Sequence, residues 1–372
     1  MNAVGRVTAY GRTLGQVRRG DACLPRMLTY TVTFTCNARC VMCDSWRKDS
    51  AGDLTLADIE RIFATLPRMD AVRLTGGEPF VRRDLTEIAA VAARTIEPAL
   101  LHVTTNGFLT DRIVDFCERR PRSLPLNLLV SIDGVGESHD RIRGHNGAFR
   151  TAMRTIEALA PRRKELRLNL AVNQTVVDAA GAAQYRELHD VLAPLGIKNQ
   201  VVVAYRESAT YSLLDETNVA PQYPGHFETF GDLSPAQLEA LFAEIETDLR
   251  AYPTAERTAK RYYLTGIRNR LLDQIAKPNP PCVALRAHMR IFPNGEVPVC
   301  QFNTRKVGNL REQSFEEIWF GKPADRARTW VRECPGCWAE CEVLPSAVYS
   351  GDLLKHALTP RAAQRRKKEQ PA

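Results

Sequence analysis

Eight of the ten cysteines in this 372-residue chain fall into two groups, and thiolates at such short spacings are typical metal ligands. The first group, Cys36, Cys40 and Cys43, has the pattern C-x3-C-x2-C. A structural zinc ion needs a fourth ligand, and zinc sites usually draw on two pairs of residues. A [4Fe–4S] cluster has four irons, so three cysteines leave one iron open to a cofactor or substrate. The spacing therefore favours an iron–sulfur cluster over zinc.

The second group lies near the C-terminus and contains five cysteines. They are Cys282, Cys300, Cys334, Cys337 and Cys341. Pro-Asn-Gly at 293–295 lies between apolar runs and predicts a β-hairpin turn, which would bring the first two of these thiols to one site. Five thiols exceed one four-ligand site by one, and a zinc ribbon stays a competing interpretation. Cys23 and Cys117 stand alone, and we expect both to be small buried side chains.

Strand and helix patterns alternate from 28 to 203 and would position the first group. Six β-rich segments are separated by amphipathic helices, at 28–34, 71–74, 100–104, 126–132, 168–172 and 200–203. This alternation predicts a parallel sheet with right-handed crossovers, which can curl into a full or partial barrel. Barrel enzymes carry their active sites at the carboxyl ends of the strands, and the first cysteine group follows the first strand there.

The C-x3-C-x2-C loop and the sequence Gly-Gly-Glu-Pro at 76–79, after the second strand, together resemble the radical S-adenosylmethionine enzymes. The resemblance covers about 28–203 and implies an α/β fold with a partial (βα)6 TIM-like barrel. It also implies a [4Fe–4S] cluster on Cys36, Cys40 and Cys43, with S-adenosylmethionine on the open iron. An injected electron would cleave the cofactor to a 5′-deoxyadenosyl radical that abstracts hydrogen from the substrate. Met42 departs from the family, which often has an aromatic residue there.

The same resemblance implies a cofactor-binding set at the strand ends. Its members are Gly76, Gly77, Glu78, Asn106, Ser131, Asp133 and Arg143. Glu78 would face the methionine ammonium group, and Arg143 would pair with the methionine carboxylate, a partner that suits the guanidinium fork. Tyr205 and Arg206 follow the sixth strand at the same end, and we expect them to contact the substrate.

The C-terminal cysteines resemble the SPASM and twitch auxiliary-cluster domains of this superfamily. The full SPASM pattern has seven cysteines and two clusters, so five cysteines imply one auxiliary [4Fe–4S] cluster. Cys282, Cys300, Cys334 and Cys337 are the expected ligands. Cys341 would replace one of the last two or remain a free thiol near the substrate, able to donate hydrogen to a substrate radical.

The resulting organisation has five parts, and twitch-like relatives suggest a reaction. The parts are a leader at 1–27, a core barrel at 28–206, a helical bridge at 207–280, a small auxiliary-cluster domain at 281–345 and a basic tail at 346–372. The resemblance implies dehydrogenation or epimerisation of a sugar or aminocyclitol carbinol in natural-product biosynthesis. The alternatives are a peptide maturase that installs thioether or carbon–carbon crosslinks, and a non-catalytic iron–sulfur scaffold or sensor. Only about 27 residues precede the first strand, too few for a peptide-binding domain, which favours a small-molecule substrate.

Composition narrows the remaining possibilities. Hydrophobic residues make up 44% and charged residues 25%, as in globular proteins, and no apolar run is long enough to span a membrane. The start of the chain lacks a secretory signal, so we expect a cytoplasmic protein that takes electrons from a donor such as flavodoxin or ferredoxin. Much of the +8 net charge lies near the chain ends without interleaved aromatic residues, which disfavours nucleic-acid binding.

Overall fold

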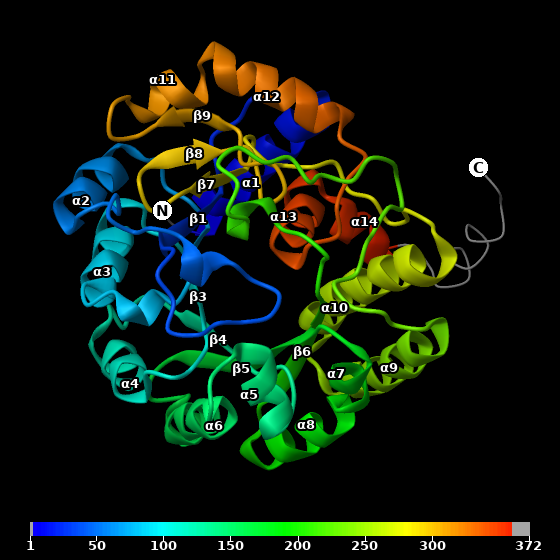
Figure 1. The fold of residues 1–372 in the computed structure, drawn as a ribbon. Helices are drawn as coiled ribbons and strands as arrows, with labels where there is room; N and C mark the ends of the chain where they lie inside the picture. The colour runs from blue at the N-terminus through cyan, green and yellow to red at the C-terminus, as the bar shows by residue number, and fades with distance from the viewer. Residues whose placement is uncertain (1–2, 359–372) are drawn as a thin grey trace.

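The computed structural model describes residues 3–358 and contains a parallel sheet that curls into an open barrel. Seven strands lie in the order β6-β5-β4-β3-β2-β1-β7, and every neighbouring pair is parallel. Their bounds are β1 Met27–Thr33, β2 Ala71–Gly76, β3 Leu100–Thr105, β4 Leu126–Ser131, β5 Leu168–Val176, β6 Lys198–Val203 and β7 His288–Ile291. Figure 1 shows them around a common centre with helices outside. The predicted partial TIM-like barrel is confirmed, with one strand more than expected.

Helices connect the first six strands and cover the outside of the barrel (Figure 1). They are α2 Leu56–Thr65, α3 Leu85–Thr95, α4 Thr110–Arg119, α5 Glu137–Arg143, α6 Ala148–Leu159, α7 Ala179–Ala183 and α8 Tyr185–Leu192. One face of each strand is apolar; the Tyr30 ring, for example, meets Phe63 of α2 with ring centroids 5.6 Å apart. Thr55 and Asp58 form a capping box at the start of α2.

The opposite face of the strands turns into the barrel and carries polar residues. Thr29 of β1 is in register with Arg73 of β2, which is in register with His102 of β3. On the other side, Thr29 is in register with Arg290 of β7. The alternation of side chains along a strand places these residues in one layer inside the barrel.

Two helices occupy the side of the barrel between β6 and β7 (Figure 1). α10 Thr254–Arg268 continues into a π-helical turn, Asn269–Asp273, and α13 spans Glu340–Ser350. Lys260 of α10 contacts Gln200 of β6 through a hydrogen bond, and Glu342 of α13 pairs with Arg290 of β7. The two helices therefore close the gap that the open sheet leaves.

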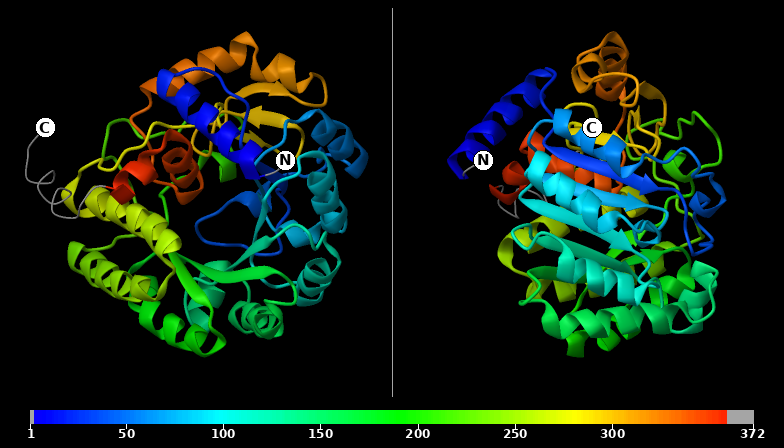
Figure 2. Two further views of the ribbon diagram at one scale, coloured as in Figure 1. Left: turned by 180° about the vertical axis from the view of Figure 1, so that it is seen from behind. Right: turned by 90° about the vertical axis from the view of Figure 1, so that its left-hand side faces the viewer.

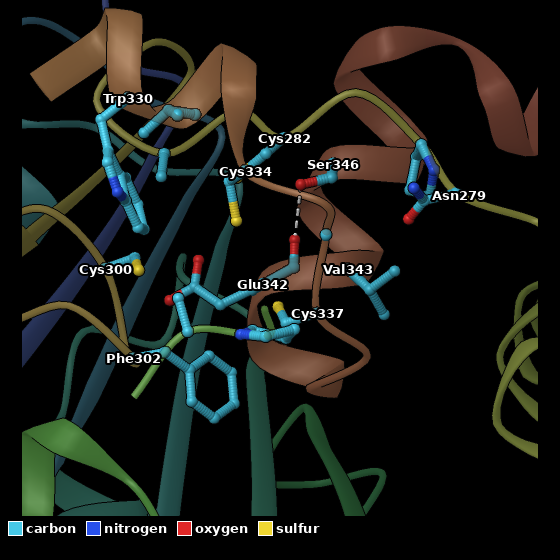
Figure 3. A pocket seen from close by; sticks show the side chains of 16 residues that line it. Asn279, Cys282, Cys300, Phe302, Trp330, Cys334, Cys337, Glu342, Val343 and Ser346 are labelled. Atoms are coloured by element: carbon cyan, nitrogen blue, oxygen red, sulfur yellow. Dashed lines mark hydrogen bonds between the residues drawn. The ribbon is translucent and has the colours of Figure 1, made fainter. Parts of the chain in front are cut away.

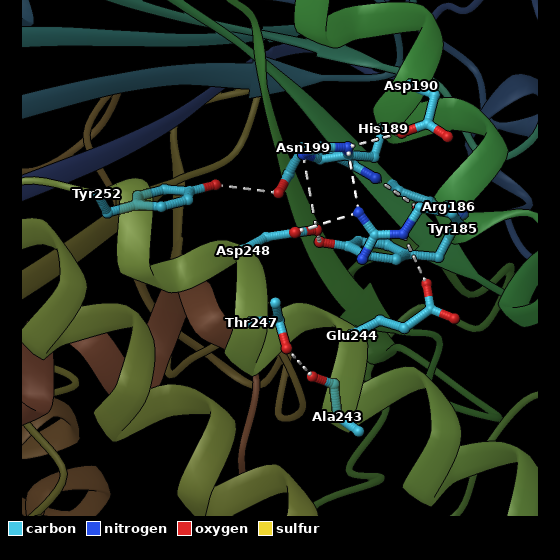
Figure 4. Close-up of polar contacts among 11 residues, drawn as sticks. Tyr185, Arg186, His189, Asp190, Asn199, Ala243, Glu244, Thr247, Asp248 and Tyr252 are labelled. Carbon is cyan, nitrogen blue, oxygen red and sulfur yellow. Dashed lines mark hydrogen bonds and ion pairs between the residues drawn. The ribbon is translucent and has the colours of Figure 1, made fainter.

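A polar network fixes α9 Pro235–Asp248 against the barrel (Figure 4). Asp248 accepts hydrogen bonds from the Tyr185 hydroxyl at 2.7 Å and from Arg186 at 3.2 Å, both on α8. Arg186 also pairs with Glu244 one turn earlier on α9. These contacts lie outside the barrel and serve to hold the helices together.

The C-terminal segment forms a small second layer beside β1. It contains the antiparallel pair β8 Glu296–Pro298 and β9 Lys306–Asn309, and the helices α11 Phe315–Trp319 and α12 Lys322–Glu333. The last helix, α14 Asp352–Leu358, lies instead beside α10 and α13 (Figure 1). The predicted turn is present, since the Gly295 N–H donates to the Phe292 carbonyl at 3.0 Å. In the described residues, however, the two strands that flank this turn form no ladder with each other, because β7 pairs with β1 and β8 pairs with β9. The hydrogen-bonding groups at the edge of β1 thus pair with β7, a strand from the C-terminal cysteine-rich segment.

The leader and the tail that the sequence suggested both contain helices. Residues 3–19 form α1 Ala3–Arg19, which packs on α13, where the Tyr10 hydroxyl donates to the Val348 carbonyl at 2.8 Å. Figure 2 shows α1 at the amino-terminal end of the strands, opposite the first cysteine loop. Residues 346–358 complete α13 and form α14, and the basic residues from Arg361 to Lys368 lie outside the described part. Within residues 3–358, no helix is both long and apolar enough to cross a membrane.

Candidate active site

A cavity of about 210 Å³ opens at the carboxyl ends of the barrel strands. The loop after β1, the ends of β2 to β5, the end of α5 and the segment after β6 contribute its walls. Among its lining residues are Cys36, Cys40, Met42, Cys43, Thr75, Gly76, Gly77, Asn106, Ser131, Arg143 and Tyr211. The cavity therefore brings together the three cysteines and five of the seven predicted cofactor-binding residues.

Backbone hydrogen bonds dock the cysteine loop on the end of α5. The Arg39 N–H donates to the Arg143 carbonyl at 2.9 Å, and the Val41 N–H donates to the Ile142 carbonyl at 3.0 Å. Gly144 follows in the left-handed region with φ of 58°, and a Cβ atom there would lie 2.4 Å from the Arg39 carbonyl oxygen. The close approach of loop and helix therefore requires glycine at this position.

Gly76 and Gly77, at the end of β2, pack against the chain that leads into the same loop from the other side. The Gly77 N–H donates to the Thr33 carbonyl at 2.9 Å. A Cβ atom on Gly77 would lie 2.3 Å from the carbonyl oxygens of Phe34 and Thr35. Both glycines line the cavity as expected, and they also let the end of β2 pack against the chain that leads to Cys36.

Glu78 is buried behind the cavity and is absent from the residues that line it. Its carboxylate accepts hydrogen bonds from the Phe80 N–H at 3.1 Å, the Thr105 hydroxyl at 2.8 Å and the Asn106 N–H at 2.7 Å. Burial raises the pKa of Glu78 to about 7, although these three donors lower it. In this structure Glu78 joins the ends of β2 and β3, and its expected contact with the methionine ammonium group stays a prediction.

Arg143 lines the cavity and is held there by Asp133, which does not line it. The Arg143 Nε lies 2.7 Å from Asp133 Oδ2, and Asp133 Oδ1 accepts a hydrogen bond from the Thr175 N–H at 2.9 Å. Burial lowers the pKa of Arg143, but the Asp133 carboxylate and the Cys40 thiol outweigh it and raise the pKa above its usual value. The guanidinium therefore remains charged and aimed at the cavity wall, 3.7 Å from Cys40 Sγ.

The donor set of the loop fits an iron–sulfur cluster. Burial raises the pKa of Cys36 to about 12 and that of Cys43 to about 11, so the thiolates need a compensating metal cation. The Ala38 N–H donates to Cys36 Sγ at 3.4 Å and the Ser45 N–H donates to Cys43 Sγ at 3.4 Å. Hydrogen bonds to the sulfurs stabilise thiolates and tune clusters. Three thiols on one loop supply one ligand fewer than the cluster has irons.

Four of the five C-terminal cysteines line a second cavity of about 30 Å³ (Figure 3). They are Cys282, Cys300, Cys334 and Cys337. Figure 3 shows the thiols of Cys300, Cys334 and Cys337 facing this space, with the Glu342 side chain beside them. Burial raises the pKa of all four thiols, which again suits ligands that bind a metal cation.

Cys341 is absent from the lining of this second cavity. It lies in the first turn of α13, where its charge interacts with those of Arg290 and Arg73 inside the barrel. Tyr211, which lines the first cavity, interacts electrostatically with both Cys43 and Cys341 and forms a hydrogen bond with Thr75. Cys341 thus stands apart from the four-thiol set, on the side of the barrel interior.

The segment after β6 brings Tyr211 into the site, and the sequence pattern does not single it out. Lys48 from the cysteine loop donates to the Thr210 carbonyl at 3.0 Å, and the Thr210 N–H donates to the Gln301 carbonyl at 3.1 Å. The segment therefore contacts both cysteine-rich parts of the chain. The irregular composition of 207–233 gave no periodic signal for this placement.

The two residues expected to contact substrate lie elsewhere. The Tyr205 ring packs between Phe227 and Phe302, with centroids 4.4 and 4.9 Å away, and lines neither of the two cavities. Arg206 points to the surface, where it pairs with Glu228 at 3.1 Å and its side chain is 65% exposed. The extended chain after β6 alternates its side chains, so these two neighbours face different environments.

Comparison with known proteins finds one family model over each cysteine group. Residues 30–175 match the model of the radical SAM superfamily, and residues 282–341 match an iron–sulfur cluster-binding domain known as SPASM. The chain is 35% identical over 332 residues to the mycofactocin maturase MftC of Mycobacterium tuberculosis, covering 83% of this chain and 73% of the relative. It is 26% identical over 349 residues to an AdoMet-dependent heme synthase of Methanosarcina barkeri, covering 86% and 88%.

Solved structures show the same fold at low sequence identity. Streptococcus suis SuiB bound to S-adenosylmethionine superposes with a TM-score of 0.56 at 17% identity, covering 84% of this chain and 70% of that one. The enzyme anSMEcpe with bound AdoMet and a peptide gives 0.56 at 14% identity, covering 93% and 100%.

The two domain matches account for both cysteine groups. The first domain implies a [4Fe–4S] cluster and S-adenosylmethionine, and the second implies auxiliary iron–sulfur ligation in the segment from Cys282 to Cys341. With a relative aligned over most of its length and a barrel that carries the cysteine loop at its strand ends, the chain belongs to the radical S-adenosylmethionine enzymes that have a C-terminal SPASM auxiliary iron–sulfur domain.

Proposed function

We propose that this enzyme is a maturase that oxidises a peptide by removing hydrogen from one of its carbon atoms. The observation that carries the proposal is the 35% identity to a mycofactocin maturase across 83% of the chain. A second relative, the PqqA peptide cyclase of Methylocella silvestris, is 24% identical over 327 residues. We therefore prefer a peptide to the sugar or aminocyclitol substrate that the sequence pattern suggested.

The proposal assigns Cys36, Cys40 and Cys43 to the first cluster. S-adenosylmethionine bound there supplies, on reduction, the radical chemistry that removes a hydrogen atom from substrate. Gly76, Gly77, Asn106, Ser131 and Arg143 would bind this cofactor, because they line the cavity beside the cysteines. Arg143 suits the methionine carboxylate since a guanidinium can form two parallel hydrogen bonds with it.

Residues behind the cavity would position these groups. Asp133 orients Arg143 through their ion pair, and Glu78 holds the ends of β2 and β3 together. Neither side chain lines the cavity, so both would act through the residues they hold.

The second cavity would house one auxiliary cluster on Cys282, Cys300, Cys334 and Cys337. An oxidation that starts with loss of a hydrogen atom must release one further electron and one proton from the substrate. A redox centre within the same fold would accept that electron. Cys341 would then not bind the auxiliary cluster. It lies on the side of α13 that faces the barrel interior.

A second candidate function is haem synthesis, since the similarity to the Methanosarcina heme synthase covers 88% of that relative. One experiment separates the two candidates. The enzyme is reconstituted anaerobically with iron and sulfide, reduced, and given either peptides encoded by short reading frames beside its gene or an iron porphyrin with propionate side chains. The peptide proposal expects 5′-deoxyadenosine together with a peptide that has lost hydrogen.

The Cys36→Ala variant is the control and should form no 5′-deoxyadenosine with either substrate. Conversion of the porphyrin, with the peptides unchanged, would reject the maturase assignment in favour of the second candidate. Absence of 5′-deoxyadenosine in a cluster-loaded sample would count against both.

A further inference from the structure

Charged side chains gather inside the barrel, beneath the cofactor cavity and beside α13. They come from β2, β3, β7, α10 and α13, and they are Arg73, His102, His288, Arg290, Lys260, Glu340 and Glu342. None of them lines the cavity near the first cysteine group. This interior cluster is therefore separate from the cavity, and each of its charged groups can be assigned an ion-pair partner or shown to lack one.

Both carboxylates of the interior cluster have cationic partners. Glu342 lies 2.8 Å from Arg290 through Oε1 and 3.2 Å from His288 Nδ1 through Oε2. Glu340 lies 3.3 Å from the Lys260 ammonium group. Arg290 and Lys260 are thereby neutralised by the two glutamates.

Arg73 is the cation left without a partner in the interior cluster. In the part of the chain that the structure describes, its side chain has no ion pair or hydrogen bond, and its Nε is buried. Its charge acts on His102, His288 and Cys341. Burial lowers the pKa of both histidines, and Arg73 lowers it further, so these rings are neutral at pH 7. The interior therefore carries one uncompensated positive charge.

Unsatisfied donors surround the same position. The Nε of Arg290 and the hydroxyl of Thr31 are buried without a hydrogen-bond partner among the described residues. Arg290 is in register with Thr29, Thr29 with Arg73, and Thr31 with Thr75. Buried donors that lack acceptors destabilise a protein, and the unpaired charge of the partly exposed Arg73 adds to this cost. A ligand that brings acceptor oxygens and a negative charge would satisfy all of them.

Arg73 lies below the cofactor cavity on the same strand that contributes to its wall. Thr75 lines that cavity, and Arg73 lies two residues earlier on β2 with its side chain on the same face. Two residues of a strand span about 7 Å. A substrate anchored at Arg73 would therefore extend upward and present a carbon atom, several bonds from the anchor, to the cavity.

We propose that Arg73 is the anchor for a carboxylate of the substrate, which binds inside the barrel between Arg73, Arg290 and Thr31. Two oxygens in one plane match the guanidinium fork, which makes a carboxylate the best-suited anion. The inference rests on the proposed function for the identity of the substrate as a peptide. Its test, however, uses neither turnover nor a peptide substrate, so the two can fail separately.

The first measurement is the melting temperature of the full, cluster-loaded chain and of Arg73→Gln. Because the variant removes an unpaired charge whose side chain is only partly exposed and whose Nε is buried, we expect its melting temperature to rise by about 2 °C or more. Arg290→Gln is the matched control, and it should lower the melting temperature, since Glu342 loses its principal partner. A fall for Arg73→Gln comparable to that of the control would overturn the proposal.

The second measurement uses N-acetylglycine and its uncharged analogue N-acetylglycinamide as probes. The acid should raise the melting temperature of the wild-type protein more than the amide does, with a concentration dependence that saturates. Arg73→Gln should lose this difference, and Arg73→Lys should retain part of it. Equal shifts for acid and amide in the wild type, or a difference that persists in Arg73→Gln, would reject a carboxylate site at Arg73.

Discussion

The Nε of Arg143 lies 2.7 Å from Oδ2 of Asp133, and both side chains are buried at the wall of the cofactor cavity. Asp133 is anchored in turn by the Thr175 N–H at the end of β5, and its own N–H donates to His139 Nδ1. Removal of one partner from a buried ion pair leaves the other charge uncompensated. The pair therefore links the stability of the barrel rim to the placement of Arg143, which lines the cavity.

Asp133→Asn should destabilise the protein by about 3–5 kcal/mol, because the buried guanidinium loses its counter-charge. Affinity for S-adenosylmethionine should fall at least about tenfold, or 1.4 kcal/mol, since Arg143 is no longer oriented. Urea unfolding and calorimetric titration of the cofactor measure the two effects. Arg141→Gln, on the same helix as Arg143, is the control, because the pair of Arg141 with Asp178 at the start of α7 is largely exposed and should contribute less than about 1 kcal/mol. Equal effects of the two variants would contradict a positioning role for Asp133.

Gly77→Ala should disrupt the cysteine loop. The new Cβ atom would lie 2.3 Å from two carbonyl oxygens of the backbone, and backbone cannot move aside as a flexible side chain can. We expect destabilisation of about 3 kcal/mol and loss of iron from the first cluster on purification. Gly11→Ala in α1 is the matched control, since nothing lies within 4 Å of the place its Cβ atom would take and alanine favours a helix by about 0.5–1 kcal/mol. Full iron content in Gly77→Ala would show that the cysteine loop can shift to accommodate the new Cβ atom, and would contradict the prediction.

Local periodicity was sufficient to predict the barrel but not its completion. The first six strands follow from the alternation of strand and helix patterns between 28 and 203, and their predicted bounds agree closely with the structure. The apolar run before the predicted turn at 293–295 gave a signal for the seventh strand, His288–Ile291, but not for its place in the barrel, because its partner β1 is about 260 residues away in the chain. Pairing at that separation depends on tertiary packing, which local sequence does not encode.

The candidate site was predictable where a motif fixes a residue and unpredictable where packing does. Seven of the eight grouped cysteines, all except Cys341, line one of the two cavities, and the glycine pair, Asn106, Ser131 and Arg143 line the first. Glu78 and Asp133 belong to the same motifs but face into the fold, which depends on the rotamer and on neighbours. Tyr211 enters the site from a loop without periodicity, and Arg206 leaves it for Glu228.

Acid should destabilise the protein through His139. Burial, helped by the nearby Arg143 charge, lowers the pKa of His139 to about 2, and Nδ1 accepts the Asp133 N–H at 2.9 Å. In the unfolded chain histidine takes up a proton near pH 6.5. The unfolded state therefore binds more protons below that pH, so the stability present above about pH 6.5 is lost as the pH falls toward the folded-state value.

His139→Asn tests this dependence, since its amide oxygen can replace Nδ1 as the acceptor. Between pH 6 and pH 5 the wild type should lose about 1.4 kcal/mol per pH unit more than the variant does. Urea unfolding across this range measures the difference. Above about pH 7.5 the two curves should run parallel, which provides the internal control. Parallel curves across the whole range would show that His139 is protonated in the folded protein.

Substitutions in the two cysteine groups should affect different steps, cofactor cleavage and substrate oxidation. Cys36→Ala should abolish 5′-deoxyadenosine formation, because the first cluster loses one of its three thiolates. Cys300→Ala should lose the auxiliary cluster yet still cleave S-adenosylmethionine, and it should fail to oxidise substrate. Iron and sulfide analysis, electron paramagnetic resonance and product analysis distinguish these outcomes.

Cys341→Ala completes the comparison, with Cys337→Ala as its matched control four residues earlier. Cys337 lines the second cavity and Cys341 does not, so only the Cys337 variant should lose iron. If Cys341 supplies hydrogen to a substrate radical, Cys341→Ala should retain both clusters and cofactor cleavage but lose product formation. Full product formation would remove Cys341 from that role, and loss of iron would instead place it among the cluster ligands.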